Sequence, residues 1–331
     1  MDATFVVMTD THFAAPGTGK DGCWWNKEIT SQSAKIAESL VSTVKSLSPD
    51  FIIHCGDLTD ASDLESFQFG KQVMDRMSCP YYFVLGNHDT WNEGVRRDIA
   101  PLFDLSADDG FYFTRRLAGM RFIFLDCAHW IKKTGETCAH IDFELHHQGA
   151  YAGIGPTEVE LQWLEQELAA HTDVPTVIVT HVPLHAKPVY AVGTLPGKQP
   201  TDGGPQEWVP VTPKRFEHES GSISKGYFVH DERVRQLIEG APNVKAVFAG
   251  HWHMFDITRH NDVVHCQTGA MVEYPLEMRL VRVESRTASM SITTVALDDP
   301  QLKRDSCLPE RKNEWVAGGP QDRVCTLSIN V

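Results

Sequence analysis

The sequence predicts an α/β fold, because short apolar runs rich in β-branched and aromatic residues alternate with segments of helical periodicity. Six runs have the length and composition of buried strands: residues 4–8, 51–54, 81–85, 121–126, 176–180 and 245–250. Four segments between them carry apolar residues at helical spacing: residues 28–47, 63–77, 157–171 and 231–240. Strands that are apolar at nearly every position indicate a sheet covered by helices on both faces.

The pattern changes after Phe255. Residues 255–260, 263–272, 276–285 and 289–297 form short runs separated by turns, with no helical segment between them. This pattern predicts a meander of antiparallel strands joined to the first sheet, or an α+β fold if these strands form a sheet of their own. No linker divides residues 1–300, which we expect to form one domain. The polar tail of residues 301–331 has no predicted place.

Two long segments interrupt the alternation of strands and helices, at residues 127–155 and 183–230. Loops of this length inside a compact domain are usually functional lids or locally disordered segments. The second segment is rich in proline, glycine and aromatic residues. It is compatible with a cap over a site or with an interface between protomers, so a homo-oligomer stays open.

Composition excludes several classes of partner. The net charge of −14 argues against a broad grip on nucleic acid or on an anionic membrane. No apolar run approaches the roughly 20 residues that span a bilayer, and residues 1–10 lack the pattern of a secretory signal. The eight cysteines are scattered without a C-x-x-C pair, which favours reduced thiols and a cytoplasmic location. Whether Cys307 and Cys325 pair is left open.

Side chains of the metal-binding type follow the predicted strands. They are Asp10 and His12, Asp57 and Asp60, Asn87 with His88 and Asp89, then His181, and finally His251 and His253. The carboxyl ends of strands in an α/β sheet face the binding crevice, so these residues should converge in space. If the chain stays extended, His251 and His253 point the same way and Trp252 points away. The small Ala249 and Gly250 before them would let the backbone approach the ligand closely.

The donor set predicts the kind of site. Each short motif alone is common in turns and helix caps, but a set of such motifs at successive strand ends indicates one shared site. Carboxylates, imidazoles and one amide, without a thiolate, suit Mn, Fe, Zn or Co better than calcium or a cysteine-rich zinc site. Seven candidate ligands exceed the need of one ion. The sequence therefore predicts two divalent or trivalent metal ions that share a carboxylate.

The order of these motifs resembles the calcineurin-like metallophosphoesterase family. The motifs are Asp-x-His, Gly-Asp-x-x-Asp, Gly-Asn-His-Asp, a lone histidine and Gly-His-x-His, and they run from Asp10 to His253. The segment TDTHF and the complete GNHD are most similar to the bacterial cyclic-nucleotide phosphodiesterase and glycerophosphodiesterase branch. The resemblance implies two mixed β-sheets packed face to face and flanked by helices. It also implies one metal held by Asp10, His12, Asp57 and His253, and a second held by Asp57, Asn87, His181 and His251.

The resemblance further implies the roles of the remaining residues. Asp57 would bridge the two ions, and a hydroxide shared by them would attack phosphorus in line. His88, with Asn87, would lie at the phosphate and stabilise the transition state or protonate the leaving oxygen. Asp60 would orient His88 through its ring N–H. The Ser/Thr protein phosphatases of the family carry an arginine directly after this second aspartate, whereas Ala61 stands here, which argues against a phosphoprotein substrate.

These observations predict a dinuclear metal-dependent hydrolase of a small phosphodiester, of the cyclic-nucleotide or glycerophosphodiester type. A phosphomonoesterase or a nucleotide pyrophosphatase would use the same metal centre, and the two long insertions would decide between them. A non-catalytic scaffold is the alternative outside enzymes, but a scaffold would be expected to lose ligands or the histidine of Gly-Asn-His, and all are present. No nucleic acid or membrane partner is expected.

Overall fold

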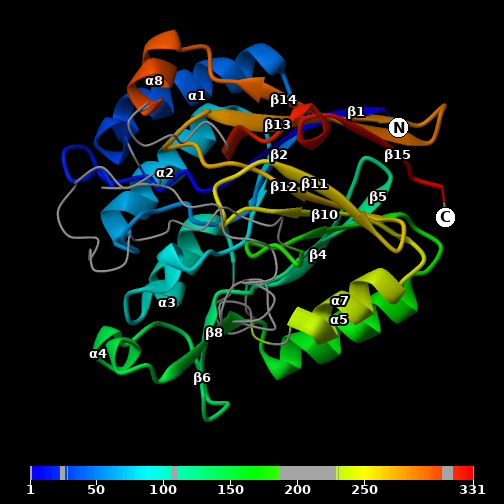
Figure 1. The fold of residues 1–331 in the computed structure, drawn as a ribbon, viewed down its shortest axis with the longest axis horizontal. Helices are drawn as coiled ribbons and strands as arrows, with labels where there is room; N and C mark the ends of the chain where they lie inside the picture. The colour runs from blue at the N-terminus through cyan, green and yellow to red at the C-terminus, as the bar shows by residue number, and fades with distance from the viewer. Residues whose placement is uncertain are drawn as a thin grey trace, which may run out of the picture.

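The computed structural model describes residues 2–22, 27, 29–105, 111–185, 229, 231–307 and 316–330. These residues form two six-stranded sheets packed face to face, and helices cover both outer faces. Figure 1 shows α1 (Ser33–Leu47) and α8 (Pro300–Ser306) on one side of the sheets, and α5 (Glu158–Ala170) and α7 (Asp231–Gly240) on the other. The predicted fold class, two mixed sheets flanked by helices, is confirmed.

The first sheet combines parallel and antiparallel strands. Its order is β15 (Cys325–Ser328), β14 (Ser289–Ala296), β13 (Glu277–Glu284), β1 (Ala3–Met8), β2 (Phe51–His54) and β3 (Tyr81–Phe83). The three N-terminal strands run parallel to one another, so their carboxyl ends reach the same edge. The three late strands add to β1 in antiparallel fashion.

The second sheet is built the same way. Its order is β11 (Asp256–His260), β12 (Val263–Gln267), β10 (Val244–Ala249), β9 (Thr176–Val179), β5 (Met120–Phe124) and β4 (Phe113–Leu117). The four central strands are parallel, while β11 and β4 pair antiparallel at the edges. The strands that carry candidate ligands are therefore divided between two sheets.

The prediction of one late meander joined to the first sheet is wrong. The β11–β12 hairpin belongs to the second sheet, where β12 pairs parallel with β10, and the β13–β14 hairpin belongs to the first sheet. Every residue of β12 is buried, so this strand needs cover on both faces. Local periodicity marks each strand but does not say which sheet will cover it.

Alternation along β1 shows how the layers are held together. Phe5 and Val7 pack into the core between the two sheets, whereas Val6 and Met8 pack under the helices. The helices α1, α2 (Leu64–Arg76), α3 (Val95–Ile99) and α8 cover the first sheet, and α5 with α7 covers the second. Each large apolar side chain buried in this way contributes about 1.5–3 kcal/mol of transfer free energy.

Helix boundaries follow from side-chain caps. Asp63 accepts a hydrogen bond from the backbone N–H of Ser66 at 2.8 Å and begins α2. Thr157 does the same for Glu160 at 3.1 Å and begins α5. Such caps typically contribute about 1 kcal/mol. They place the starts of both helices close to the predicted positions.

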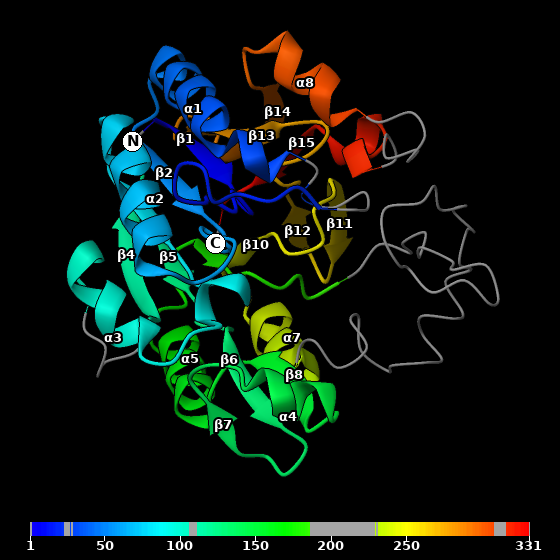
Figure 2. The same ribbon diagram turned by 90° about the vertical axis from the view of Figure 1, so that its left-hand side faces the viewer.

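The first long insertion has regular structure. Residues 127–155 form a three-stranded sheet of β6 (His129–Lys132), β7 (Thr137–Cys138) and β8 (Tyr151–Gly155), with the short α4 (Phe143–His147). Figure 2 shows these elements at the same end of the molecule as α5 and α7. Trp130 and Ile154 join the core under α5, which explains why the segment is ordered rather than an irregular loop.

The remaining sequence predictions have mixed outcomes. Residues 186–228 and 230, which make up most of the second insertion, lie outside the described residues. The prediction that this insertion forms a cap or an interface concerns these residues and stays a prediction. The C-terminal residues contribute α8 and β15 to the same fold.

No disulfide joins any two of the seven cysteines that the structure describes, Cys307 and Cys325 included. No helix within the described ranges is long and apolar enough to cross a membrane.

Candidate metal centre

The loops that follow five strands meet at one edge of the two sheets. The backbone N–H of Asp10 donates to the carbonyl of Gly56 at 2.9 Å, and that of Gly250 donates to the carbonyl of His181 at 2.9 Å. A third bond joins the two sheets, because the backbone N–H of His251 donates to the Asp10 carboxylate at 2.9 Å. The predicted ligands, which are far apart in the sequence, therefore lie together.

One group of predicted ligands surrounds a single point. Asp10, His12, Asp57 and His253 are buried, and their ligand atoms lie within 4.8 Å of one another. His12 Nε2 lies 3.2 Å from His253 Nε2 and 3.7 Å from Asp57 Oδ2. His253 Nε2 lies 3.2 Å from Asp10 Oδ1. Ligands that are each about 2.0–2.2 Å from one ion lie roughly 3–4 Å apart, so this spacing fits a shared cation.

A second group adjoins the first through Asp57. His181 Nε2 lies 3.4 Å from Asp57 Oδ2 and 3.1 Å from Asn87 Oδ1. His251 Nδ1 lies 2.9 Å from the same Asn87 oxygen and 3.2 Å from His181 Nε2. The atom Oδ2 of Asp57 thus faces a histidine of each group, His12 and His181, which is the position a bridging carboxylate needs.

The contacts within these groups fit metal ions better than hydrogen bonds alone. In each group two imidazole nitrogens face one another at 3.2 Å, as His12 and His253 show, and such nitrogens need a proton or a cation between them. Asp10 Oδ1 is buried and completes no hydrogen bond with any described residue. Its one close contact is His253 Nε2 at 3.2 Å, and a buried carboxylate oxygen satisfied so weakly is costly, so a bound cation would lower that cost. The residues therefore fit a pair of ions with nitrogen and oxygen ligands.

Charges in the site compensate one another. Burial opposes ionisation of Asp57, but His181 and His88 outweigh it and hold the pKa of that carboxyl well below its usual range. Although burial also works against His181, the Asp57 carboxylate raises the pKa of its imidazole to about 9. Burial, with the charge of His181, lowers the pKa of His251 to about 3. Asp57 and His251 are thus in the protonation states that bind metal, whereas His181 would release its proton to an arriving ion.

The backbone of the ligands is not extended, which corrects the expectation that they alternate along strands. Five of them have positive φ: Asp10 at 49°, His12 at 40°, Asp57 at 52°, His251 at 70° and His253 at 53°. The strands β1 and β10 end before these residues, so left-handed turns, not strand alternation, aim the side chains. Each such residue costs of order 1–3 kcal/mol and persists only where the surrounding structure holds it. Trp252 packs against Met254 and Val316, as expected of a packing residue, and its ring centroid lies 5.6 Å from that of His251.

Two glycines make this close packing possible. Gly56 has a φ of 97°, and a Cβ there would lie 2.6 Å from His181 Nδ1. A Cβ on Gly250 would lie 1.9 Å from Thr9 Oγ1 and 2.5 Å from Asp10 Oδ2. The close backbone approach expected at Ala249 and Gly250 is thus made by Gly250.

Glu273 is a residue of the site that the sequence motifs do not mark. Its side chain is fully buried, and its Oε1 accepts a hydrogen bond from His253 Nδ1 at 3.0 Å. Its Oε2 accepts from the backbone N–H of Lys27. A carboxylate behind a metal-binding histidine fixes the ring and directs its other nitrogen at the ion. Glu273 lies 20 positions beyond His253, in no recognisable motif, so only the fold reveals it.

His88 occupies the more open side of the site. Its side chain is 16% exposed, and its Nδ1 lies 2.8 Å from the backbone carbonyl of Asp60 and 3.6 Å from the Asp60 carboxylate. The ring N–H of His88 therefore faces the main chain of Asp60 and not its carboxylate, which was the group expected to orient the ring. The carboxylate instead faces Lys27 Nζ at 2.8 Å and His12 Nδ1 at 3.4 Å. The charge of Lys27 draws it in that direction.

Asp89 ties the motif loops together instead of facing the ligands. Its carboxylate accepts hydrogen bonds from the backbone N–H groups of Leu58 at 3.1 Å, Thr59 at 2.9 Å and Gly86 at 3.0 Å. These bonds connect the loop after β2 to the loop after β3. The last residue of Gly-Asn-His-Asp therefore positions the loops that carry Asp57 and Asn87.

Comparison with known proteins gives the class. The family model of the calcineurin-like phosphoesterases matches residues 3–255. A probable glycerophosphodiester phosphodiesterase from Arcobacter nitrofigilis is 22% identical over 183 residues, which are 54% of this chain and 56% of that protein. The match thus spans about half the length of this curated relative.

Solved structures share the fold. A dimetal phosphatase from Danio rerio superposes with a TM-score of 0.61 at 16% identity, covering 89% of this chain and 99% of that one. A purple acid phosphatase from yellow lupin, Lupinus luteus, gives a TM-score of 0.56 at 14% identity, covering 99% of this chain and 54% of that one. Together with the family match, these findings define the class. The chain belongs to the calcineurin-like phosphoesterase family and carries a candidate metal-binding cluster.

Proposed function

We propose that the protein is a dinuclear metal-dependent hydrolase of a small phosphodiester, of the cyclic-nucleotide or glycerophosphodiester type. The observation that carries the proposal is the pair of ligand groups that adjoin through Asp57 and lie beside the partly exposed His88. The curated relative from Arcobacter nitrofigilis, itself described as a probable phosphodiesterase, supports the substrate class.

The metal-binding residues divide between two ions. Asp10, His12, Asp57 and His253 would hold one ion, and Asp57, Asn87, His181 and His251 the other. Two bound ions would supply Lewis acidity toward the phosphoryl oxygens and a nucleophile from water near neutral pH. Glu273 keeps His253 in the orientation that such binding needs, since it accepts the proton on Nδ1. Manganese, iron, zinc and cobalt all suit this donor set.

His88 is placed to act on the phosphate ester. With Nδ1–H donating to the carbonyl of Asp60, its Nε2 is the ring atom left for a phosphoryl oxygen or the leaving oxygen. The ring is held on two sides, by Trp91 at 4.1 Å between centroids and by the edge of His12 at 4.7 Å. A ring fixed in this way can stabilise negative charge, or transfer a proton, at one defined position.

Charge near the site favours a diester. Ala61 provides no positive charge next to Asp60, and Lys27 is engaged by the Asp60 carboxylate at 2.8 Å. A phosphodiester carries one negative charge at neutral pH, whereas a monoester carries up to two, so a diester requires less cationic recognition beyond the metal ions. The same reasoning argues against the phosphomonoesterase alternative.

Two further parts of the proposal concern the cell. The seven described cysteines form no disulfide with one another, which suits a reducing compartment and supports a cytoplasmic location. Fractionation of cells that produce the protein, followed by immunoblotting, checks this location. Sedimentation of the purified protein checks whether it forms a homo-oligomer.

The test of the activity compares an aryl phosphodiester with the matching monoester. Purified protein is stripped of metal, reloaded with manganese and assayed with bis(4-nitrophenyl) phosphate and 4-nitrophenyl phosphate. We expect the higher kcat/KM for the diester, and loss of both activities in Asp57→Asn. A preference for the monoester would contradict the proposed substrate class, and so would a protein that holds two ions but cleaves neither compound.

A further inference from the structure

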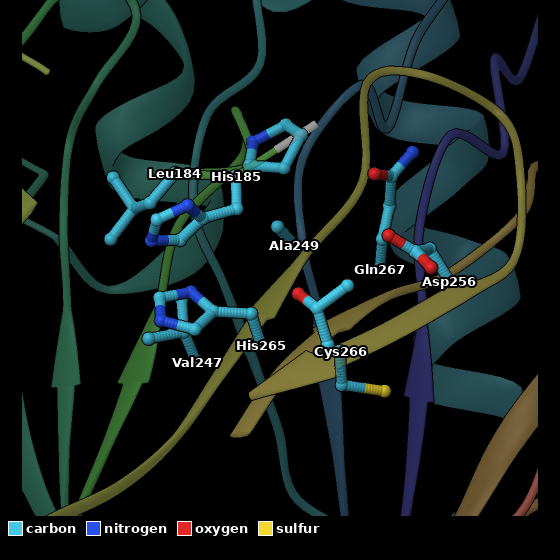
Figure 3. Close-up of a pocket in the computed structure, with 10 residues that line it drawn as sticks. Leu184, His185, Val247, Ala249, Asp256, His265, Cys266 and Gln267 are labelled. Carbon is cyan, nitrogen blue, oxygen red and sulfur yellow. The ribbon is translucent and has the colours of Figure 1, made fainter. Parts of the chain in front are cut away.

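A second cluster of metal-binding side chains involves none of the residues described above. His185, Glu239 and His265 come from the segment after β9, from α7 and from β12, and their ligand atoms lie within 4.8 Å of one another. His185 and His265 also line a pocket with residues of β10, β11 and β12. Figure 3 shows their rings close together at one end of this pocket, with Asp256 and Gln267 toward the other.

The three side chains converge on one carboxylate oxygen. Glu239 Oε1 lies 2.5 Å from His185 Nε2 and 3.3 Å from His265 Nε2. The second oxygen, Oε2, accepts a hydrogen bond from Asn261 Nδ2 at 3.4 Å. Two ligands about 2.1 Å from a tetrahedral ion lie roughly 3.4 Å apart, so a small shift of His185 would let all three bind one ion.

His265 is the observation that points to a ligand. The residue is only 6% exposed, and neither of its ring nitrogens completes a hydrogen bond with a described residue. The only contact of Nε2 with a described polar group is Glu239 Oε1 at 3.3 Å, and a buried imidazole so weakly satisfied is costly, so this nitrogen needs either a proton shared with Glu239 or a cation. Burial, followed by the neighbouring His185, lowers the pKa of His265 to about 3, so the ring is neutral at physiological pH. The neutral ring is the form that binds metal.

The surroundings of His185 support the same interpretation. Its ring stacks on that of His260 with a centroid distance of 3.5 Å and an interplanar angle of 2°. The ring is thus held between His260 on its face and the Glu239 carboxylate at Nε2. The His185 side chain is 21% exposed, which gives an ion a route from solvent.

We propose that His185, Glu239 and His265 form a separate mononuclear site for zinc. Two imidazoles and a carboxylate, without a thiolate, form a three-residue zinc ligand set that leaves the fourth position to water. Calcium and magnesium prefer ligand sets made of oxygen, so they do not compete well here. Residues 185 and 239 are 54 positions apart in the sequence, and an ion bound by both and by His265 would tie the segment after β9 and α7 to β12 of the second sheet.

Zinc stoichiometry tests this site independently of the proposed function. Protein stripped of metal, reloaded with zinc and freed of excess by gel filtration is analysed by elemental mass spectrometry. We expect three zinc ions per chain in the wild type, two in Glu239→Gln and His265→Asn, and one in Asp57→Asn. His147→Asn, a change at an exposed histidine of α4, should keep three.

Cobalt substitution adds a spectroscopic readout. Cobalt(II) in the Asp57→Asn protein should show the visible absorption of a four-coordinate ion, and adding Glu239→Gln should remove it. Folding is checked by circular dichroism, and Glu239→Gln serves if His265→Asn does not fold. The proposed zinc site would be contradicted if the folded Glu239→Gln protein bound as many zinc ions as the wild type. It would also be contradicted if the Asp57→Asn protein bound no zinc. If the proposed dinuclear centre does not exist, Asp57→Asn should instead bind as many zinc ions as the wild type.

Discussion

The two metal-ligand clusters are built from different kinds of backbone. Five ligands of the candidate metal centre lie in turns with positive φ, and the glycines at 56 and 250 make their close packing possible. In the zinc cluster, Glu239 lies in α7 and His265 in β12, and none of its three residues has a positive φ. The candidate metal centre therefore requires particular residues in its turns, whereas the zinc cluster requires no particular residues next to its ligands.

This difference explains what each cluster tolerates. A strained turn persists only where packing and hydrogen bonds hold it, so the candidate metal centre should respond strongly to changes in any supporting residue. Two ligands of the zinc cluster lie in regular elements, α7 and β12, and none needs a left-handed turn. Its loss should leave turnover almost unchanged and appear only in metal content and thermal stability.

The largest effect on turnover is expected from Asp57→Ala. Removing the carboxylate shared by both groups should abolish binding of both ions and lower kcat/KM by more than roughly 10³-fold, because several kcal/mol of Lewis-acid stabilisation are lost. Metal analysis and a diester assay measure the two effects. Asp173→Ala, the same change at an exposed turn, is the control. Retention of both ions by Asp57→Ala would show that Asp57 is not the bridge.

His88→Ala is expected to separate catalysis from metal binding. The ring lies beside the ligands but is not among them, so metal content should stay normal while kcat falls by roughly 10²–10⁴-fold, the usual contribution of a general acid or base. Elemental analysis and steady-state kinetics on the same sample give both values, with His147→Ala as the matched control. Loss of the ions in His88→Ala would mean that the site is assigned incorrectly.

Glu273→Gln tests a supporting residue that no motif marks. The amide cannot hold the Nδ1–H of His253 as a carboxylate does, so metal affinity or activity should fall by roughly 10–100-fold. Competition with a chelating dye measures the affinity, and Glu284→Gln on the exposed face of β13 is the control. If excess metal restores full turnover, Glu273 acts through metal binding. An unchanged affinity would contradict its role.

The smallest effect on turnover is expected from His185→Asn. Its kcat/KM should stay within about twofold of the wild type. Its thermal midpoint in zinc should fall, because an ion present at about 100 times its Kd contributes about 2.7 kcal/mol to the folded state. Calorimetry with and without zinc, beside His147→Asn, measures this difference. A large loss of activity in His185→Asn would contradict the conclusion that the zinc cluster does not contribute to turnover.

Short motifs made much of this protein predictable from its sequence. Apolar strands between helical segments predict the fold class, because burial on both faces leaves a continuous apolar run. The turns at Gly-Asp and Gly-His-x-His can be recognised because they contain residues with a left-handed backbone, and the turn at Gly-Asn-His-Asp because a Cβ on Gly86 would lie 2.1 Å from Asp57 Oδ1. The motifs therefore mark Asp57, Asn87 and His251 as candidate ligands in the sequence itself.

Tertiary structure alone decided the rest. Whether β12 joins the first sheet or the second depends on which neighbours cover it, and its own residues are equally suited to either. Glu273 and the cluster of His185, Glu239 and His265 gain their chemistry from partners that are distant in sequence or lie in other elements. The physical reason is that metal binding needs only that ligand atoms meet in space. Where no strained turn or close approach restricts the local sequence, the sequence contains no motif that reveals which ligand atoms come together.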